Sequence, residues 1–190
     1  MKKSDHTKKK ILAASEELFM KKSISKVTVN EITEKAGVAK GTFYLYFDSK
    51  ETLVWQYIEE RLVNLNHIIK NLELDGFSEE NIRKVIADIV SYAKKHKVIL
   101  RLMHHVKFFT FLGSKRMQDK HVNNWIEWTT IWLKKGKLEG NLSLKDTKFT
   151  AYFLVLSIHE VLEKVLLSEL PFSFEEAENH LQDIVLKILK

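Results

Sequence analysis

A basic and a phenolic side chain share a short stretch with glycine at residues 37 to 50, GVAKGTFYLYFDSK. If this stretch is helical, Lys40, Gly41 and Tyr44 fall on one face. The ammonium of Lys40 can reach guanine acceptors or a phosphate, and Tyr44 can contact a thymine methyl or bond a phosphate. Gly41 lets the backbone approach closely. These residue types at this spacing predict a face that reads double-stranded DNA.

Four further residues extend this chemistry: Thr42, Tyr46, Thr28 and Lys50. The first two flank the face, and the other two lie near helix starts, where phosphates are commonly bound. The first 50 residues contain no arginine, so guanine contacts there would depend on lysine. The competing interpretation is that the aromatic string only completes a core. Phe43 and Phe47, four residues apart, are the pair expected to anchor the helix.

The elements that must position this face have clear local signals. Thr28 followed by Glu31 forms a capping box, which predicts a short helix beginning near Val29. Gly37 stands where a left-handed residue ends that helix. A second short helix is expected over 40–47. Two short helices joined by a glycine turn predict a helix-turn-helix.

Composition separates this region from the rest of the chain. Residues 1–50 carry 11 lysines against 6 acidic residues, whereas the other 140 residues carry 20 basic and 19 acidic residues. A basic first quarter indicates a polyanionic partner, although a solvated lysine surface would look the same. The chain has no cysteine, which excludes disulfides and thiolate sites and fits the cytoplasmic location that we expect. No apolar run is long enough to predict a membrane span.

One proline and six glycines in 190 residues favour an all-α fold. Apolar periodicity and caps predict helices over 5–21, 49–72, 79–95, 98–111, 115–137, 144–168 and 174–189, besides the two short ones. Asp48 with Glu51, Ser143 with Asp146, and Ser173 with Glu176 are the expected caps of three of them. We expect a DNA-binding domain at 1–53 and a larger helical domain at 54–190.

Residues 8 to 53, KKKILAASEELFMKKSISKVTVNEITEKAGVAKGTFYLYFDSKETL, resemble the DNA-binding region of TetR-family (tetracycline-repressor-like) regulators. The resemblance implies a three-helix DNA-binding domain, a larger ligand-binding domain and a homodimer. It also implies DNA contacts at Thr28, Lys40, Gly41, Thr42, Tyr44, Tyr46 and Lys50. The chain departs from the family pattern at Ser23, where glycine is usual, and at Ala39, where a capping serine is common.

The last two predicted helices are rich in apolar residues. The helix over 144–168 is apolar on two sides, so it can fill a core and still leave surface for a partner. Together with the resemblance, this predicts that the two helices pair with their copies in a dimer, although a fully internal core remains the alternative. The residues expected at the interface are Val155, Ile158, Leu162, Val165, Leu181, Ile184, Val185 and Ile188.

Aromatic residues in the second half predict a pocket for a fairly apolar small molecule, with a few polar groups. Ordinary core packing explains each residue equally well. The residues expected to line it are Trp55, His104, Phe108, Trp125, Trp128, Phe149, Tyr152 and His159. His159 and Glu163 are four residues apart, yet no HExxH, ExxH, GxGxxG or P-loop motif occurs. We therefore expect no metal, no cofactor and no enzymatic activity.

These features predict a ligand-responsive transcriptional regulator, a repressor released from a palindromic operator by a small apolar or aromatic ligand. An activator and a ligand-independent DNA-binding protein are close alternatives. A helical small-molecule-binding protein or enzyme whose helix-turn-helix is only structural is the alternative from another class. Effector, operator sequence and regulated genes are not encoded in any residue pattern found here.

Overall fold

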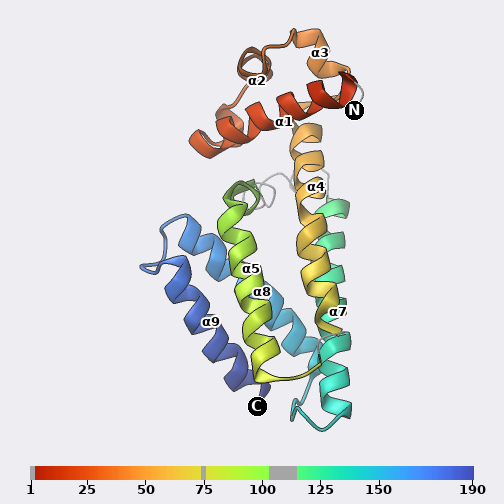
Figure 1. Cartoon of the computed structure of the whole chain (residues 1–190), viewed down its shortest axis with the longest axis vertical. Coiled ribbons are helices and arrows are strands. Elements are labelled where there is room, and N and C mark those ends of the chain that lie inside the picture. The colour runs from red at the N-terminus through yellow and green to blue at the C-terminus, as the bar shows by residue number, and fades with distance from the viewer. Residues whose placement is uncertain (1–2, 74–75, 103–114) are drawn as a thin grey trace. The chain divides into compact units, whose positions relative to one another are not determined.

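The computed structural model describes the backbone of residues 3–73, 76–102 and 115–190, and within these ranges every regular element is helical. The all-α expectation is therefore confirmed (Figure 1). No helix in the described ranges is both long and apolar enough to cross a membrane. The chain forms two compact units, Met1–Arg61 and Leu62–Lys190, which divide within the helix α4.

The first unit contains α1 (Lys3–Lys21), a 3₁₀ turn (Ile24–Lys26), α2 (Val29–Ala36), α3 (Lys40–Tyr44) and the first half of α4 (Lys50–Lys70). Its core consists of side chains that are at most 2 % exposed, among them Ile11, Phe19, Ile24, Val27, Ile32, Phe43, Phe47 and Leu53. Burial of these apolar groups supplies most of the unit's stability, because helices as short as α2 and α3 are marginal alone.

Local signals fix the helix boundaries in this unit. The Thr28 hydroxyl accepts a hydrogen bond from the Glu31 amide, and the Glu31 carboxylate accepts one from the Thr28 amide, so the capping box is present. Gly37 adopts φ 65°, ψ 39° and ends α2 as expected. At the start of α4 the cap differs from the expectation: Ser49 Oγ, not the Asp48 carboxylate, accepts from the Thr52 amide at 3.0 Å.

The second unit contains the end of α4, the 3₁₀ turn Asn71–Glu73, α5 (Glu79–Lys95), α7 (Lys115–Leu138), α8 (Thr147–Leu166) and α9 (Phe174–Leu189). Helix α7 packs against α8, α5 packs against α9, and α8 also packs against α9 (Figure 1). Residues 97–102 are helical, and the rest of the helix expected over 98–111 lies outside the described residues.

Caps at the helix starts of the second unit are also local. Ser78 caps α5, and Ser173 caps α9 as expected, in a full capping box with Glu176. For α8, Asp146 is itself the N-cap and accepts from two backbone amides, so it takes the capping role expected of Ser143.

Candidate DNA-contacting face and apolar cavity

Helix α3 separates its side chains into a buried and an exposed set. Phe43 and Phe47 are 0 % and 1 % exposed, so they anchor the helix as the sequence predicts. Lys40 and Gly41 are exposed, and Tyr44 is 49 % exposed. Several lysines of this unit form ion pairs, but Lys40 forms no ion pair or hydrogen bond with any residue that the structure describes. Its charge is therefore available to an external partner.

The exposed phenol is held in place by its neighbour. The Tyr44 ring packs edge-on against the Phe43 ring, with centroids 5.3 Å apart and an interplanar angle of 81°. A favourable aromatic contact to a buried ring restricts the Tyr44 side chain before any partner binds. Thr42 and Tyr46 are half-buried beside this face.

One exposed residue was missed by sequence reasoning. Leu45 follows the last residue of α3 and is 80 % exposed. The sequence could have indicated this exposure. Leu45 is two residues from both Phe43 and Phe47, so on a helix it does not share their buried face. An exposed leucine beside Tyr44 offers an apolar contact suited to a thymine methyl group.

The expected phosphate contact at Thr28 competes with an internal partner. The Thr28 amide donates to Glu31 Oε2 at 2.9 Å, and its hydroxyl lies 3.1 Å from the same oxygen. Hydrogen bonds from Lys22, and then from the Thr28 amide and hydroxyl, lower the pKa of the Glu31 carboxyl to about 2. Because the folded pKa is lowered, this cap stabilises the unit above the ordinary pKa near 4.5 and is lost as the pH falls toward 2.

Lys50 is engaged inside its own unit. Its ammonium donates to the carbonyl oxygens of Ile24 and Val27, at 2.7 Å each. The side chain thus ties the first turn of α4 to the segment before α2, and it is half-buried. Unlike the exposed Lys40 and Tyr44, Lys50 therefore already has internal partners.

We expect Lys50→Ala to lower the free energy of unfolding of the first unit by about 1.5–3 kcal/mol, since two charge-assisted hydrogen bonds are lost and two carbonyls lose their donor. Thermal unfolding followed by circular dichroism measures the change. Lys26→Ala, an exposed lysine in the same segment, serves as the matched control and should leave the melting temperature nearly unchanged. Equal melting temperatures for the two variants would contradict a structural role for Lys50.

The second unit contains an apolar cavity of about 120 Å³. Most of its wall is aliphatic and aromatic, and Tyr92, His96, Thr129 and His159 are among the few polar contributors. Of the residues predicted to line a pocket, Trp125 and His159 do so. The Trp125 indole nitrogen donates to Asn66 Oδ1 at 2.7 Å, which fixes its ring.

The other pocket residues predicted from sequence are not brought to this cavity. Phe149 is 70 % exposed and Tyr152 is 40 % exposed, Trp128 is half-buried outside the cavity wall, and Trp55 belongs to the first unit. His104 and Phe108 lie outside the described residues. Aromatic content alone therefore does not predict which side chains line this cavity.

The structure buries one apolar face of α8 within the protomer and exposes the other. Several residues expected at a dimer interface are buried within the protomer: Leu162, Val165, Leu181 and Val185. Val155, Ile158, Leu162 and Val185 line the cavity, and Ile188 is half-buried. Only Ile184 of the expected set is well exposed, at 52 %. The exposed apolar face of α8 consists instead of Phe149, Tyr152, Phe153 and Leu156.

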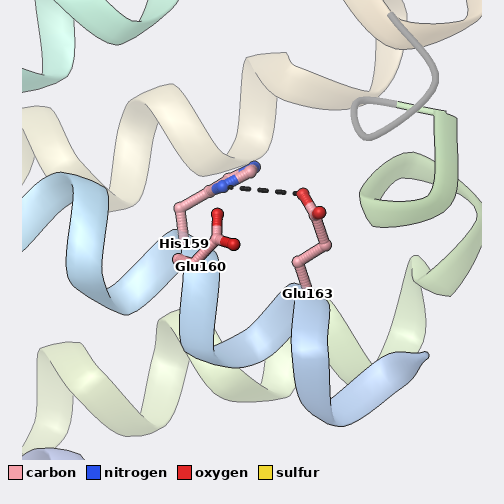
Figure 2. Close-up of side chains that lie close together, drawn as sticks. All are labelled: His159, Glu160 and Glu163. Atoms are coloured by element: carbon pink, nitrogen blue, oxygen red, sulfur yellow. Dashed lines mark ion pairs between the residues drawn. The ribbon is translucent and has the colours of Figure 1, made fainter. Parts of the chain in front are cut away.

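A buried ion pair adjoins the cavity wall. The Nδ1 atom of His159 lies 3.9 Å from Oε2 of Glu163, which is 1 % exposed at its side chain (Figure 2). Glu160 comes from the same helical turn, and the three residues offer ligand atoms within 4.8 Å of one another. Zinc ligands lie about 2.0–2.2 Å from the ion, so two ligand atoms on one ion are at most about 4.4 Å apart, and a pair separated by 4.8 Å would have to move closer together. The present geometry is that of a His–Glu pair.

Comparison with known proteins agrees with this architecture. Residues 11–56 match the family model described as bacterial regulatory proteins, tetR family. An HTH-type transcriptional regulator of Bacillus subtilis, YvdT, whose function is uncharacterised, is 28 % identical over 185 residues, covering 90 % of this chain and 85 % of that protein.

Two solved structures share the fold at lower identity. FadR from Bacillus subtilis, in complex with stearoyl-CoA, superposes with a TM-score of 0.73 at 16 % identity, covering 95 % of this chain and 98 % of that one. The second structure is NalD, the secondary repressor of the MexAB-OprM multidrug efflux pump of Pseudomonas aeruginosa. It superposes with a TM-score of 0.71 at 18 % identity, covering 98 % of each chain. A helix-turn-helix with an exposed basic and phenolic face, a larger helical unit, the matched family model and the full-length relative lead to one conclusion. The chain is a DNA-binding transcriptional regulator whose helix-turn-helix unit is that of the TetR family.

Proposed function

We propose that this protein is a repressor that leaves its operator when a small apolar molecule enters the cavity of the second unit. The observation that carries the proposal is the path of α4. Its first turn is bonded to the helix-turn-helix unit through Lys50, and its last turns contribute Leu65 and Ile69 to the cavity wall. One continuous helix therefore joins the residues that would contact DNA to those that would contact a ligand.

We propose that the DNA-contacting set is Lys40, Gly41, Tyr44 and the flanking Thr42 and Tyr46, acting in the cytoplasm on a palindromic operator. A homodimer supports this, because two identical heads match two half-sites related by two-fold symmetry. The exposed apolar face of α8, with Ile184 of α9, supplies the surface for the second copy. Contacts from Thr28 and Lys50 are secondary, since both already serve internal bonds.

One solved structure of this fold supplies a precedent for a ligand, and another supplies a precedent for repression. One was crystallised with stearoyl-CoA, and another represses a multidrug efflux pump. For this chain, the apolar wall of the cavity supports a ligand that is mainly hydrophobic. The ligand can change DNA affinity only if it binds the DNA-bound and DNA-free conformations with different affinities. A shift of the last turns of α4 on ligand entry is the expected source of that difference.

The first step of the test is to identify an operator. The purified protein is used to select binding sites from random DNA, and the selected sequences are searched for an inverted repeat. Operator affinity is then measured with and without apolar ligands that stabilise the protein against heat. We expect a bound ligand to weaken operator binding by about five- to 150-fold, the usual range of allosteric coupling. Ligands that bind without changing operator affinity would refute the proposed release.

A matched variant separates ligand action from general effects. Ala93 is 4 % exposed and lines the cavity, so Ala93→Leu fills part of it. This variant should keep its operator affinity and lose its response to ligand, at a stability cost of about 1–3 kcal/mol from overpacking.

Operator affinity should also fall steeply with added salt, which a helical binding protein without a DNA function would not show.

A further inference from the structure

Trp132 carries a buried hydrogen-bond donor beside the cavity. Its side chain lines the cavity and is 5 % exposed. The indole nitrogen Nε1 is buried, and no acceptor for it exists among the described residues. An indole N–H is a donor only, so it cannot be satisfied by a neighbouring donor. Buried donors are nearly always paired, which makes this one informative.

The other tryptophan of the wall provides a contrast. Trp125 donates its Nε1 hydrogen to Asn66 Oδ1 at 2.7 Å. Both rings come from α7 and both line the same cavity, yet only one N–H has an acceptor within the described protein. The cavity therefore presents one satisfied and one unsatisfied indole.

The Trp132 ring is fixed from outside the cavity. Phe77 stacks on it, with centroids 4.5 Å apart and an interplanar angle of 26°. Gly136 makes room for this stack one turn further along α7, because a Cβ there would come within 2.7 Å of the Phe77 ring. Phe77 covers one face of the indole, so a molecule in the cavity would meet the opposite face or the edge.

The charged residues around the cavity restrict the chemical class of the ligand further. None of the lining residues that the structure describes is a lysine or an arginine. The buried carboxylate of Glu163 lies directly beside the lining residue His159, 3.9 Å from its Nδ1 atom (Figure 2). An anionic head group would find no lysine or arginine partner in this wall. It would also have to share the imidazole of His159 with the carboxylate of Glu163, which is unfavourable in a medium of low dielectric constant.

We propose that the cavity selects an uncharged, largely apolar molecule carrying a hydrogen-bond acceptor, such as a ketone, whose oxygen accepts from Trp132 Nε1. This inference rests on the proposed ligand-binding function and specifies the chemical class of the ligand. The buried N–H gives orientation and selectivity, while the aliphatic and aromatic wall supplies the bulk of the affinity.

The test is a double-mutant cycle that combines Trp132→Phe with two probes of nearly the same shape. The probes are propiophenone and propylbenzene, and propiophenone has a carbonyl group where propylbenzene has a methylene group. Binding is measured by calorimetry on the intact protein. We expect Trp132→Phe to weaken propiophenone by about five- to tenfold and to change propylbenzene by less than about twofold. Trp125→Phe, whose N–H is already bonded, should change both affinities by the same factor.

Each other outcome has a defined meaning. If Trp132→Phe alters both probes equally, the donor is not used and the inference is overturned, while a ligand cavity still stands. If neither probe binds the wild-type protein, the ligand-binding function itself fails and the inference fails with it. Binding of 3-phenylpropanoate as tight as that of propiophenone would overturn the preference for uncharged ligands.

A second measurement avoids dependence on a variant that fails to fold. In the ¹⁵N-labelled wild-type protein, the indole N–H resonance of Trp132 should move downfield with propiophenone and stay nearly fixed with propylbenzene. Equal shifts with the two probes would contradict the hydrogen bond even if Trp132→Phe could not be studied.

Discussion

Replacing Lys40 and Tyr44 together with alanine is expected to weaken operator binding by on the order of a hundredfold or more, with the fold and dimer intact. Each side chain is exposed and contributes little to the core, so stability should change by less than about 0.5 kcal/mol. A specific base or phosphate contact is worth about 1–3 kcal/mol, and two of them per half-site in a dimer multiply the effect. Fluorescence anisotropy with labelled operator measures it.

The control for charge is Lys187→Ala, which removes an exposed lysine from α9. It should leave operator affinity within about twofold, because it lies in the other compact unit. Gel shifts that stay unchanged in the Lys40, Tyr44 double variant would rule out this face as the reading surface, and attention would pass to the other exposed lysines of the first unit.

The second large effect is expected from a single charge on the exposed face of α8. Phe153→Asp should convert the dimer to monomers at micromolar concentration, because a carboxylate buried in an apolar interface costs at least about 3 kcal/mol per site. Phe153 is 48 % exposed in the protomer, so the variant should still fold. Sedimentation equilibrium reports the mass, and operator affinity should fall in parallel as the two heads lose their linkage.

A second aspartate substitution tests whether any exposed apolar residue would behave the same way. Leu138, at the end of α7, is 88 % exposed and lies outside α8 and α9. Leu138→Asp should remain dimeric. A Phe153→Asp protein that sediments as a dimer would place the interface elsewhere on the second unit.

The features that sequence predicted well are those decided within a few residues. The capping boxes of Thr28 and Ser173, the left-handed Gly37 and the burial of Phe43 and Phe47 depend on neighbours three or four positions away, which the sequence displays directly. For the same reason, the sequence alone predicts which side of α3 is exposed.

The features that sequence missed depend on tertiary packing. Helix α8 is apolar on two sides, so periodicity could not say which side faces α7 and α9. The reach of Lys50 to Ile24 and Val27 spans more than twenty positions, and a lysine side chain carries no pattern that reveals it. Trp125 and Trp132 both line the cavity, but only coordinates show that one N–H lacks an acceptor.

The length of α4 has a mechanical consequence for a regulator of this kind. Its 21 residues contain neither glycine nor proline and, at 1.5 Å per residue, extend about 30 Å. Pivoting such a rod by about 5° displaces one end by about 2.5 Å relative to the other. Hydrogen bonds tolerate only about 0.5 Å of variation in donor–acceptor distance. In the release mechanism that we propose, a small sideways displacement near Ile69 would therefore move the opposite end of α4 by more than the hydrogen bonds of a base contact tolerate.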